Sequence, residues 1–308
     1  MLAICSRSVS RSKSALKILS SKFKEIKLNT SNKNLSDNNL INFVKDSEVI
    51  IVGIDKIDKK LLDQCPKLKL IGKYGVGTNN IDFNELKRRK IRILLQPGIN
   101  KRAVSELTLA FMIMGLRDIY KTTSEVKKLN WPFFVGDQLT NKKIGIIGCG
   151  NIGKDLIKLL KPFDCEINTH DIKPNNSYLK RNKLTNSSID FVLTNSDIIS
   201  IHIPYNIQNH NIISSKKISL LKKDSLLINT SRGDLVDEIF LYKFLKKNNE
   251  AMAIFDVMKV EPPNNKKLIS LDNFILTSHI AGTTKSSLES ASIDCANKII
   301  KVINEECK

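Results

Sequence analysis

The chain has 308 residues, 41% hydrophobic and 26% charged, which is long enough for two domains with substantial cores. No apolar run reaches the roughly 18 residues that a membrane span requires. The six scattered cysteines form no C-x-x-C pair, which argues against a zinc site or a disulfide framework and favours a reducing, cytoplasmic location.

The formal net charge of +19 has two interpretations. One is a nucleic-acid or anionic-membrane partner, and the other is a set of lysines spread over solvated helix faces. Basic pairs such as Lys59-Lys60 and Lys222-Lys223 are dispersed, with no stripe and no interleaved aromatics. We therefore expect neither nucleic acid nor a membrane as a partner, and only mild steering of anionic substrates.

The first 22 residues contain no acid and many Ser, Lys and Arg, which is typical of an organellar transit peptide. The same stretch also predicts a short buried strand and an amphipathic helix, followed by a second strand at "EIKLN" (25–29). Because these residues then serve as structure, we expect no cleavage.

Strand and helix patterns alternate over residues 48–96. "EVIIVG" (48–53) is a continuous apolar run, as expected of a parallel strand covered on both faces. "KLIGKYGVG" (69–77) predicts a strand that ends in a glycine loop, and "IRILLQ" (91–96) predicts another strand. Helical patterns between these runs complete βαβ units, so we expect a parallel sheet.

The stretch "KRAVSELTLAFMIMGLRDIY" (101–120) predicts one long helix that is apolar nearly all round. Such a helix is deeply buried, either between domains or in a dimer interface. Trp131 follows in a loop with Pro and Gly, and we interpret it as a packing anchor rather than a residue that stacks on a ligand.

A glycine pattern follows in "KKIGIIGCGNIGKDLIKLL" (142–160), where Gly148, Gly150 and Gly153 lie between a strand pattern and a helix pattern. In a dinucleotide site the first glycine allows a tight turn, the second lets backbone approach the pyrophosphate, and the third lets helix and strand pack closely. Asp171 ends the next predicted strand, where its carboxylate would bind ribose hydroxyls and repel the extra phosphate of NADP. The pattern predicts NAD, although Lys173 weakens this preference; a glycine turn in a plain α/β domain is the alternative.

Further βα units extend to residue 282, and three strand patterns among them end in residues that can carry chemistry. Arg232 follows "LLINTS", Glu261 follows "DVMKV", and His279 follows "ILTS". Beside a hydride cofactor, His suits proton transfer, a carboxylate fixes its tautomer, and Arg binds a carboxylate bidentately. Each residue alone has a structural alternative, namely a surface cation, a turn residue and a satisfied histidine. We interpret His202 as structural or cofactor-adjacent.

These blocks resemble the D-isomer-specific 2-hydroxyacid dehydrogenases, the family of D-3-phosphoglycerate, D-glycerate and D-lactate dehydrogenases. The matching stretches are "YGVGTNNID", "SELTLAFMIMGLR", "GIIGCGNIGK", "INTSRGDLVDE", "DVMKVEPP" and "SHIAGTT", in order over nearly the whole chain. The resemblance implies two Rossmann-like, doubly wound parallel-sheet α/β domains with the active site in the cleft between them. Residues 1–98 and 284–308 would form the substrate-binding domain, and residues 99–283 the NAD-binding domain.

The resemblance also implies roles for individual residues. His279 would be the general acid and base, Glu261 would tune it, and Arg232 would bind the carboxylate of the 2-oxo acid and polarise its carbonyl. Backbone N–H groups of Val76 and Gly77 would hold the same carboxylate. Beyond the three glycines and Asp171, the NAD site would include Asn151, Ile152, Thr230, Asp256 and Gly282. A homodimer through the NAD-binding domain is implied, and no metal.

The chain departs from the family in two places. Members that act on 3-phosphoglycerate tend to carry an Arg-Ser pair where this chain has "VGIDK" (52–56), so that Gly53 and Ile54 replace the phosphate-binding residues; Arg7 and Lys73 are candidate substitutes. The chain also ends soon after its last predicted helix, so we expect no serine-sensing tail domain and no feedback inhibition by serine.

The favoured function is NAD-dependent interconversion of a 2-oxo acid and a D-2-hydroxy acid. The favoured substrate is phosphohydroxypyruvate, paired with 3-phosphoglycerate, or another small phosphorylated or sugar-derived acid. Formate dehydrogenase is a sister alternative, but its chemistry needs no proton relay and its chains are longer. An NAD(H)-sensing, partner-binding protein of the corepressor type is the alternative from another class.

Overall fold

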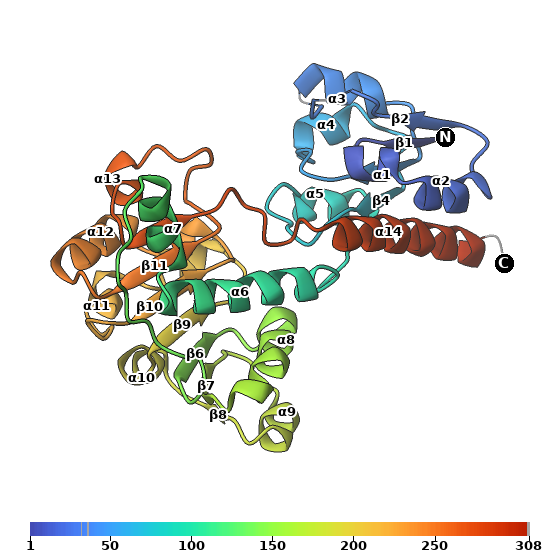
Figure 1. Ribbon diagram of the computed structural model, residues 1–308. Coiled ribbons are helices and arrows are strands. Elements are labelled where there is room, and N and C mark those ends of the chain that lie inside the picture. The colour runs from blue at the N-terminus through green and yellow to red at the C-terminus, as the bar shows by residue number, and fades with distance from the viewer. Residues whose placement is uncertain (32, 36, 307–308) are drawn as a thin grey trace. The chain divides into compact units, whose positions relative to one another are not determined.

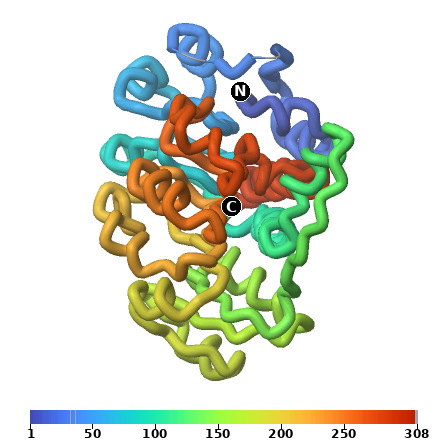
Figure 2. Tube along the Cα trace, turned by 60° about the vertical axis from the view of Figure 1, so that its left-hand side comes forward, coloured from blue at the N-terminus to red at the C-terminus, as the bar shows by residue number. Residues whose placement is uncertain are grey.

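The computed structural model describes residues 1–31, 33–35 and 37–306, and the chain divides into two compact units. Unit 1 comprises Met1–Asn100 and Thr283–Lys308, and unit 2 comprises Lys101–Gly282. The first part of the chain (blue) and the last (red) therefore belong to the same unit (Figures 1 and 2). Each unit is an α/β domain on an all-parallel sheet, which confirms the predicted fold class.

Unit 1 is built on a five-stranded sheet in the order β2-β1-β3-β4-β5. Its strands are β1 (Leu2–Ile4), β2 (Ile26–Leu28), β3 (Val49–Val52), β4 (Leu70–Lys73) and β5 (Arg92–Leu94). All four residues of β3 are buried, as the continuous apolar run predicted. The predicted strand–helix–strand opening is confirmed, because residues 2–28 form the first two strands and two helices between them.

The helices of unit 1 come from both ends of the sequence. They are α1 (Arg7–Arg11), α2 (Lys13–Ser20), α3 (Asp37–Val44), α4 (Lys59–Asp63), α5 (Phe83–Arg88) and α14 (Lys285–Glu306). Helix α14 packs on α2 and β4, and its Cys295 and Ile299 join the core beside Leu2 and Ile4 (Figure 1). A Cβ on Gly72 would lie 2.7 Å from Ile299 Cδ1, so any larger residue would require α14 side chains to shift.

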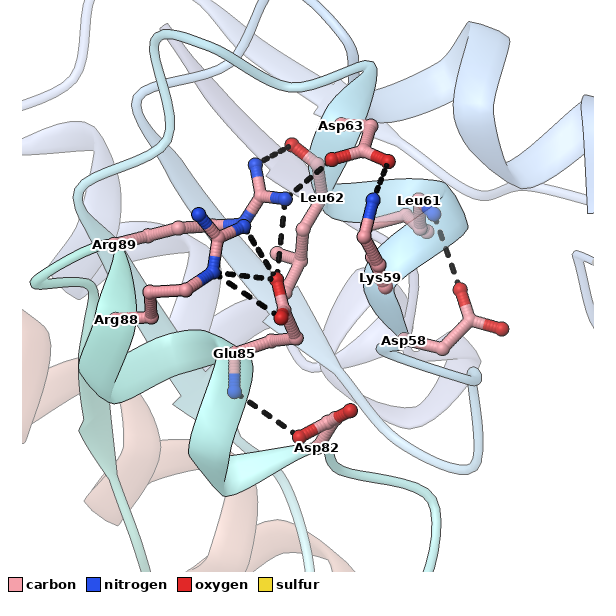
Figure 3. A network of polar contacts seen from close by, with 9 residues as sticks. All are labelled: Asp58, Lys59, Leu61, Leu62, Asp63, Asp82, Glu85, Arg88 and Arg89. Atoms are coloured by element: carbon pink, nitrogen blue, oxygen red, sulfur yellow. Dashed lines mark hydrogen bonds and ion pairs between the residues drawn. The ribbon is translucent and has the colours of Figure 1, made fainter.

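A polar network joins α4 to α5 at the surface of unit 1. Figure 3 shows Arg88 and Arg89 directed at the carboxylate of Glu85, while Arg89 also reaches Asp63 and the carbonyl of Leu62. Asp58 and Asp82 cap the two helices through backbone N–H groups (Figure 3). The network therefore ties α4 to α5.

Unit 2 is built on a seven-stranded sheet in the order β12-β11-β10-β9-β6-β7-β8. Its strands are β6 (Lys143–Ile147), β7 (Glu166–His170), β8 (Thr185–Asn186), β9 (Ile198–Ile201), β10 (Leu226–Asn229), β11 (Met252–Phe255) and β12 (Phe274–Leu276). Neighbouring residues such as Ile146 and Ile147 join different core clusters, because successive side chains point to opposite faces. Helices must therefore cover both faces of this sheet.

The α-helices of unit 2 are α6 (Lys101–Leu116), α7 (Ile119–Lys127), α8 (Asn151–Leu160), α9 (Asn176–Arg181), α10 (Ile189–Asn195), α11 (Ser215–Ile218), α12 (Glu238–Lys247) and α13 (Lys266–Ile269). Short 3-10 turns occur at η1 (Lys161–Phe163), η2 (Ile207–Asn209) and η3 (Gly233–Leu235). Helix α6 packs on α8, β10 and β11, which buries Phe111 and Met112.

The prediction of one helix over residues 101–120 is wrong, because the chain breaks between α6 and α7. Asp118 adopts φ +46°, a left-handed conformation that ends a helix. The segment that follows α7 comes back to the end of α6, where Asp137 N donates to the carbonyl of Leu116 at 2.9 Å. A Cβ on Gly136 would lie 2.7 Å from that carbonyl oxygen, so glycine permits the approach.

The interpretation of Trp131 as a packing anchor is also wrong within this chain, since 89% of its surface is exposed. Five cysteines in the described residues are free, and Cys307 lies outside those residues. Within the part of the chain that the structure describes, no helix combines the length and apolar character needed to cross a membrane.

Candidate active site

Three neighbouring strands bring the chemical residues to one edge of the unit 2 sheet. Strands β10, β11 and β12 are adjacent and parallel, so their carboxyl ends lie at the same edge. Arg232 follows β10, Glu261 follows β11, and His279 follows β12. This is the edge at which open α/β sheets hold ligands.

The imidazole of His279 is bound to the carboxylate of Glu261. His279 Nδ1 lies 2.7 Å from Glu261 Oε2, and Glu261 Oε1 accepts the backbone N–H of Met258 at 3.0 Å. Both carboxylate oxygens are therefore held, and the histidine tautomer with hydrogen on Nδ1 is favoured. The His279 side chain is 48% exposed, which leaves Nε2 as the nitrogen for proton exchange with a substrate.

Asp256 holds the backbone around this histidine. It is 1% exposed, and its two carboxylate oxygens accept the backbone N–H groups of Ile280 and Ala281, each at 2.8 Å. Its carbonyl oxygen accepts the N–H of His279 at 2.9 Å. His279 itself adopts φ +56°, a left-handed conformation that costs free energy in any residue other than glycine. Asp256 supplies the hydrogen bonds that hold that conformation.

Gly233 allows the Arg232 loop to touch the Glu261 loop. A Cβ on Gly233 would lie 2.0 Å from the carbonyl carbon of Met258 and 2.1 Å from the backbone nitrogen of Lys259. Neither backbone atom can move without shifting the segment that carries Glu261. Glycine at this position is thus a requirement of the site's geometry.

Arg232 is partly buried, and its Nη1 donates to the carbonyl of Ser231 at 2.6 Å. Burial lowers the pKa of Arg232, while the charges of Glu261 and Asp234 act in the opposite direction. The guanidinium remains charged at neutral pH, because arginine is the most basic of the side chains. The planar guanidinium presents a fork of N–H donors, which is suited to binding a carboxylate.

The glycine loop between β6 and α8 has the geometry that each glycine was expected to supply. Gly148 adopts φ +102°, and a Cβ there would lie 2.5 Å from the carbonyl oxygen of His202. A Cβ on Gly153 would lie 2.2 Å from the carbonyl oxygen of Gly148. In contrast, a Cβ on Gly150 would meet no atom within 4 Å. The first and last glycines are needed by the fold, and the middle one borders the space that a phosphate group would fill.

Other predicted cofactor residues surround this loop. Asn151 and Ile152 form the first turn of α8, where free N–H groups and the helix dipole favour phosphate. Asp171 follows β7, and its carboxylate accepts the N–H groups of Cys149 and Lys173 at 2.9 and 2.8 Å. These residues fit an NAD molecule whose pyrophosphate meets the helix and whose ribose meets the aspartate.

Thr230, Gly282 and Asp256 were also predicted to line the NAD site. Thr230 is buried, with its hydroxyl 3.3 Å from that of Thr108 on α6, and Gly282 is the last residue of unit 2. The carboxylate of Asp256 is already used by the loop that carries His279. The structure therefore points to a positioning role for Asp256 that sequence reasoning missed; only the position of Asp256 directly after a buried strand hinted at it.

Val76 and Gly77 belong to unit 1, where they follow β4. The preceding Gly75 adopts φ +82°, and its N–H donates to Gln96 Oε1 at 3.1 Å. This bond and the left-handed glycine set the course of the loop that presents the two backbone N–H groups.

The remaining histidines have structural partners. His202 is buried with Nε2 2.9 Å from the hydroxyl of Ser200, and burial lowers its pKa from 6.5 to about 3. His170 Nδ1 lies 2.7 Å from the carbonyl oxygen of Ser187, and His210 packs edge-on against Tyr205. Among the described residues no group of three or more His, Cys, Asp or Glu could hold a metal ion.

Comparison with known proteins identifies related chains. The family model for the NAD binding domain of D-isomer specific 2-hydroxyacid dehydrogenases matches residues 109–281. The glyoxylate reductase of Thermofilum pendens is 33% identical over 284 residues, covering 87% of this chain and 81% of that protein. The D-3-phosphoglycerate dehydrogenase of Methanocaldococcus jannaschii is 31% identical over 281 residues, covering 88% of this chain. This chain spans only 53% of the length of that second relative.

Solved structures have the same architecture. The crystal structure of D-lactate dehydrogenase from Aquifex aeolicus, complexed with NAD and lactic acid, superimposes with a TM-score of 0.83 at 27% identity. The match covers 99% of this chain and 96% of that one. The likeness therefore extends over both units.

Proposed function

Because this chain belongs to the D-isomer-specific 2-hydroxyacid dehydrogenase family and residues 109–281 form its NAD-binding domain, we propose that it interconverts a 2-oxo acid and a D-2-hydroxy acid. The observation that carries this proposal is the 2.7 Å contact between His279 Nδ1 and Glu261 Oε2 at the carboxyl edge of the sheet. A solvent-accessible histidine held by a carboxylate is suited to moving a proton.

NAD, when bound, supplies or accepts the hydride. Residues of the chain bind the substrate and transfer the proton. His279 Nε2 gives a proton to the substrate oxygen during reduction and takes it back during oxidation. Glu261 keeps the imidazole oriented and stabilises its protonated form. Arg232 of unit 2 binds the substrate carboxylate. In unit 1, the backbone N–H groups of Val76 and Gly77 are proposed as carboxylate donors, which would make unit 1 the substrate-binding domain.

The geometry of the glycine loop supports the cofactor part of the proposal. Asn151 and Ile152 would hold the pyrophosphate at the start of α8, beside the open space at Gly150. Asp171 would bind the ribose hydroxyls and favour NAD over NADP. Thr230 and Gly282 would complete the site from the ends of β10 and unit 2.

The favoured substrate pair remains 3-phosphoglycerate and phosphohydroxypyruvate, and the named relatives include both a phosphoglycerate dehydrogenase and a glyoxylate reductase. The relatives are named for oxidoreductase activities, which favours catalysis over the corepressor alternative. The free thiols of the described cysteines fit the proposed reducing, cytoplasmic location.

A homodimer through unit 2 is also part of the proposal. The segment that follows α7 exposes 95% of Leu129, 89% of Trp131 and 93% of Phe133. Contiguous exposed apolar side chains of this size are typical of a surface that another protein chain covers. A second copy of unit 2 would bury them.

The test is NADH oxidation at neutral pH against phosphohydroxypyruvate, hydroxypyruvate, glyoxylate, pyruvate and bulkier 2-oxo acids. We expect turnover that prefers one of these acids, and a loss of about 10² to 10⁴ in kcat for His279→Ala. NADH binding, measured by fluorescence, should survive the substitution. If the chain binds NADH but turns over none of these acids, the catalytic proposal is contradicted. The corepressor alternative would then be favoured.

A further inference from the structure

A cavity of about 440 Å³ in unit 1 lies between α1 and the first turns of α14. Its volume is in the range of small-molecule sites, which are about 300–1,000 Å³. The polar side chains that line it include Arg7, Ser8, Arg11, Lys285, Glu289 and Ser292. The last three are spaced four and three residues apart, so they share one face of α14.

The cavity lies at the carboxyl edge of the unit 1 sheet. Arg7 comes three residues after β1 ends at Ile4. Burial raises the pKa of Tyr74, directly after β4, and hydrogen bonds with Ser8 and Ser292 partly offset this rise. Two residues beyond Tyr74 are Val76 and Gly77, the proposed carboxylate-binding loop. The cavity thus adjoins the part of unit 1 that is proposed to meet the substrate.

The charge of the lining favours an anion. Three cationic side chains, Arg7, Arg11 and Lys285, face a single carboxylate, that of Glu289. Guanidinium groups present planar forks that match phosphate oxygens, and a lysine adds a point charge. The hydroxyl of Ser8 on α1 offers a further donor around the same space. Such a mixture of donors is typical of phosphate sites rather than of apolar ligand sites.

The two candidate phosphate-binding residues, Lys73 and Arg7, have different environments. Lys73 is 3% exposed, and its Nζ donates to the carbonyl of Tyr74 at 2.9 Å, which keeps it in the core. Arg7 lines the cavity. At the position where phosphoglycerate enzymes carry Arg-Ser, the N–H of Gly53 is bound to Asp55 Oδ2 at 2.9 Å and Ile54 is 71% exposed. An anion site in this unit would therefore be the cavity beside α14.

We propose that this cavity binds the phosphate group of a phosphorylated 2-oxo acid, with Arg7, Arg11 and Lys285 as its cationic ligands. The proposal rests on the proposed function for the identity of the substrate, but the site itself requires only an anion. It places the phosphate-binding residues of this chain on α1 and α14 instead of the loop after β3.

The first experiment measures binding without catalysis. Inorganic phosphate is titrated by calorimetry into the full chain, and the double variant Arg7→Gln, Lys285→Gln is compared with Arg88→Gln, which removes a cation from another surface of unit 1. We expect phosphate affinity to fall about ten-fold or more in the double variant, as for the loss of charge-assisted hydrogen bonds, and to stay unchanged in Arg88→Gln. Equal affinities in all three proteins would overturn the site.

A second variant gives a result that misfolding cannot mimic, because it is expected to increase the affinity for phosphate. Glu289→Gln removes the one carboxylate from the lining, so phosphate should bind several-fold more tightly while circular dichroism stays unchanged. The matched control is Asp190→Asn, which neutralises a surface carboxylate of unit 2. Unchanged affinity in Glu289→Gln would overturn the site, and an equal gain in the control would show that net charge rather than the cavity controls binding.

Kinetics then decide whether the anion belongs to the substrate. KM for phosphohydroxypyruvate should rise about ten-fold in Lys285→Gln, while KM for hydroxypyruvate stays unchanged. If phosphate binds but both substrates respond alike, the cavity holds a free anion and the substrate assignment fails. If no 2-oxo acid turns over in the wild-type chain, the proposed function fails, and the phosphate titration still judges the site.

Discussion

His279 Nδ1 and Glu261 Oε2 lie 2.7 Å apart, and they come from the ends of two neighbouring parallel strands. The carboxylate is in turn fixed by the backbone N–H of Met258 at 3.0 Å. The pair is therefore oriented before any substrate arrives, which is what a proton-transferring histidine requires.

Replacing Glu261 by Gln should lower kcat by about 10²-fold or more with little change in KM, because the neutral amide cannot stabilise a protonated imidazole. The matched control is Glu238→Gln. Glu238 Oε1 also binds this segment, through the N–H of Lys259 at 2.7 Å, without reaching the histidine. An equal loss of kcat in the two variants would mean that both carboxylates only hold the loop in place.

Asp256→Asn tests the residue that holds the histidine loop. An amide has one acceptor oxygen, so one of the N–H groups of Ile280 and Ala281 would face a donor instead. We expect about 1–3 kcal/mol less stability in urea unfolding and a lower kcat, with NADH affinity largely kept. A variant that loses NADH binding first would place Asp256 in the cofactor site rather than behind His279.

Two glycine-to-alanine changes should separate folding from cofactor binding. Gly233→Ala places a Cβ about 2 Å from backbone atoms of Met258 and Lys259, so we expect severe destabilisation, by several kcal/mol. Gly150→Ala meets no atom within 4 Å, so its melting temperature should match the wild type while NADH affinity falls. Thermal unfolding and NADH titration of both variants give the comparison, and a destabilised Gly150→Ala with intact NADH affinity would refute it.

His202 should make the fold sensitive to acid. Burial lowers its pKa from 6.5 to about 3. Between these pH values His202 is protonated in the unfolded chain but not in the folded chain. Stability from this site is complete above pH 6.5 and falls as pH drops toward 3, by up to about 1.4 kcal/mol per pH unit. His202→Gln should show a shallower loss of unfolding free energy between pH 7 and pH 5. Parallel slopes for the two proteins would exclude His202 as the cause.

Trp131→Ser combined with Phe133→Ser should convert a dimer into a monomer, since both side chains are almost fully exposed in the single chain. Sedimentation equilibrium at micromolar concentration measures the mass. The control is Ile172→Ser, which removes an apolar side chain that is 84% exposed outside this segment. A wild-type chain that sediments as a monomer would remove the basis for the dimer proposal.

The sequence predicted the features that depend on neighbouring residues. Buried parallel strands such as Val49–Val52 are recognisable as continuous apolar runs, and the glycines at 148, 150 and 153 follow a known spacing. The meeting of Arg232, Glu261 and His279 also followed from local patterns, because parallel strands deliver their ends to one edge.

Features set by distant residues were missed. The break after Leu116 depends on the chain returning at Gly136 and Asp137, which no helical pattern in α6 reveals. The role of Asp256 depends on hydrogen bonds to a loop beyond the next strand. The basic cavity joins α1 to α14, from opposite ends of the sequence, so no local motif could indicate it.

The joining of both chain ends in unit 1 has a consequence for biosynthesis. Cys295 and Ile299 of α14 complete the core that surrounds Leu2 and Ile4, yet they are synthesised only after the whole of unit 2. Unit 2 is one continuous stretch, so it can fold during translation while the residues before it wait for their final helix. Nascent unit 1 therefore exposes the apolar surface that α14 later covers. Chaperones should bind most strongly to chains whose synthesis has stopped before residue 285.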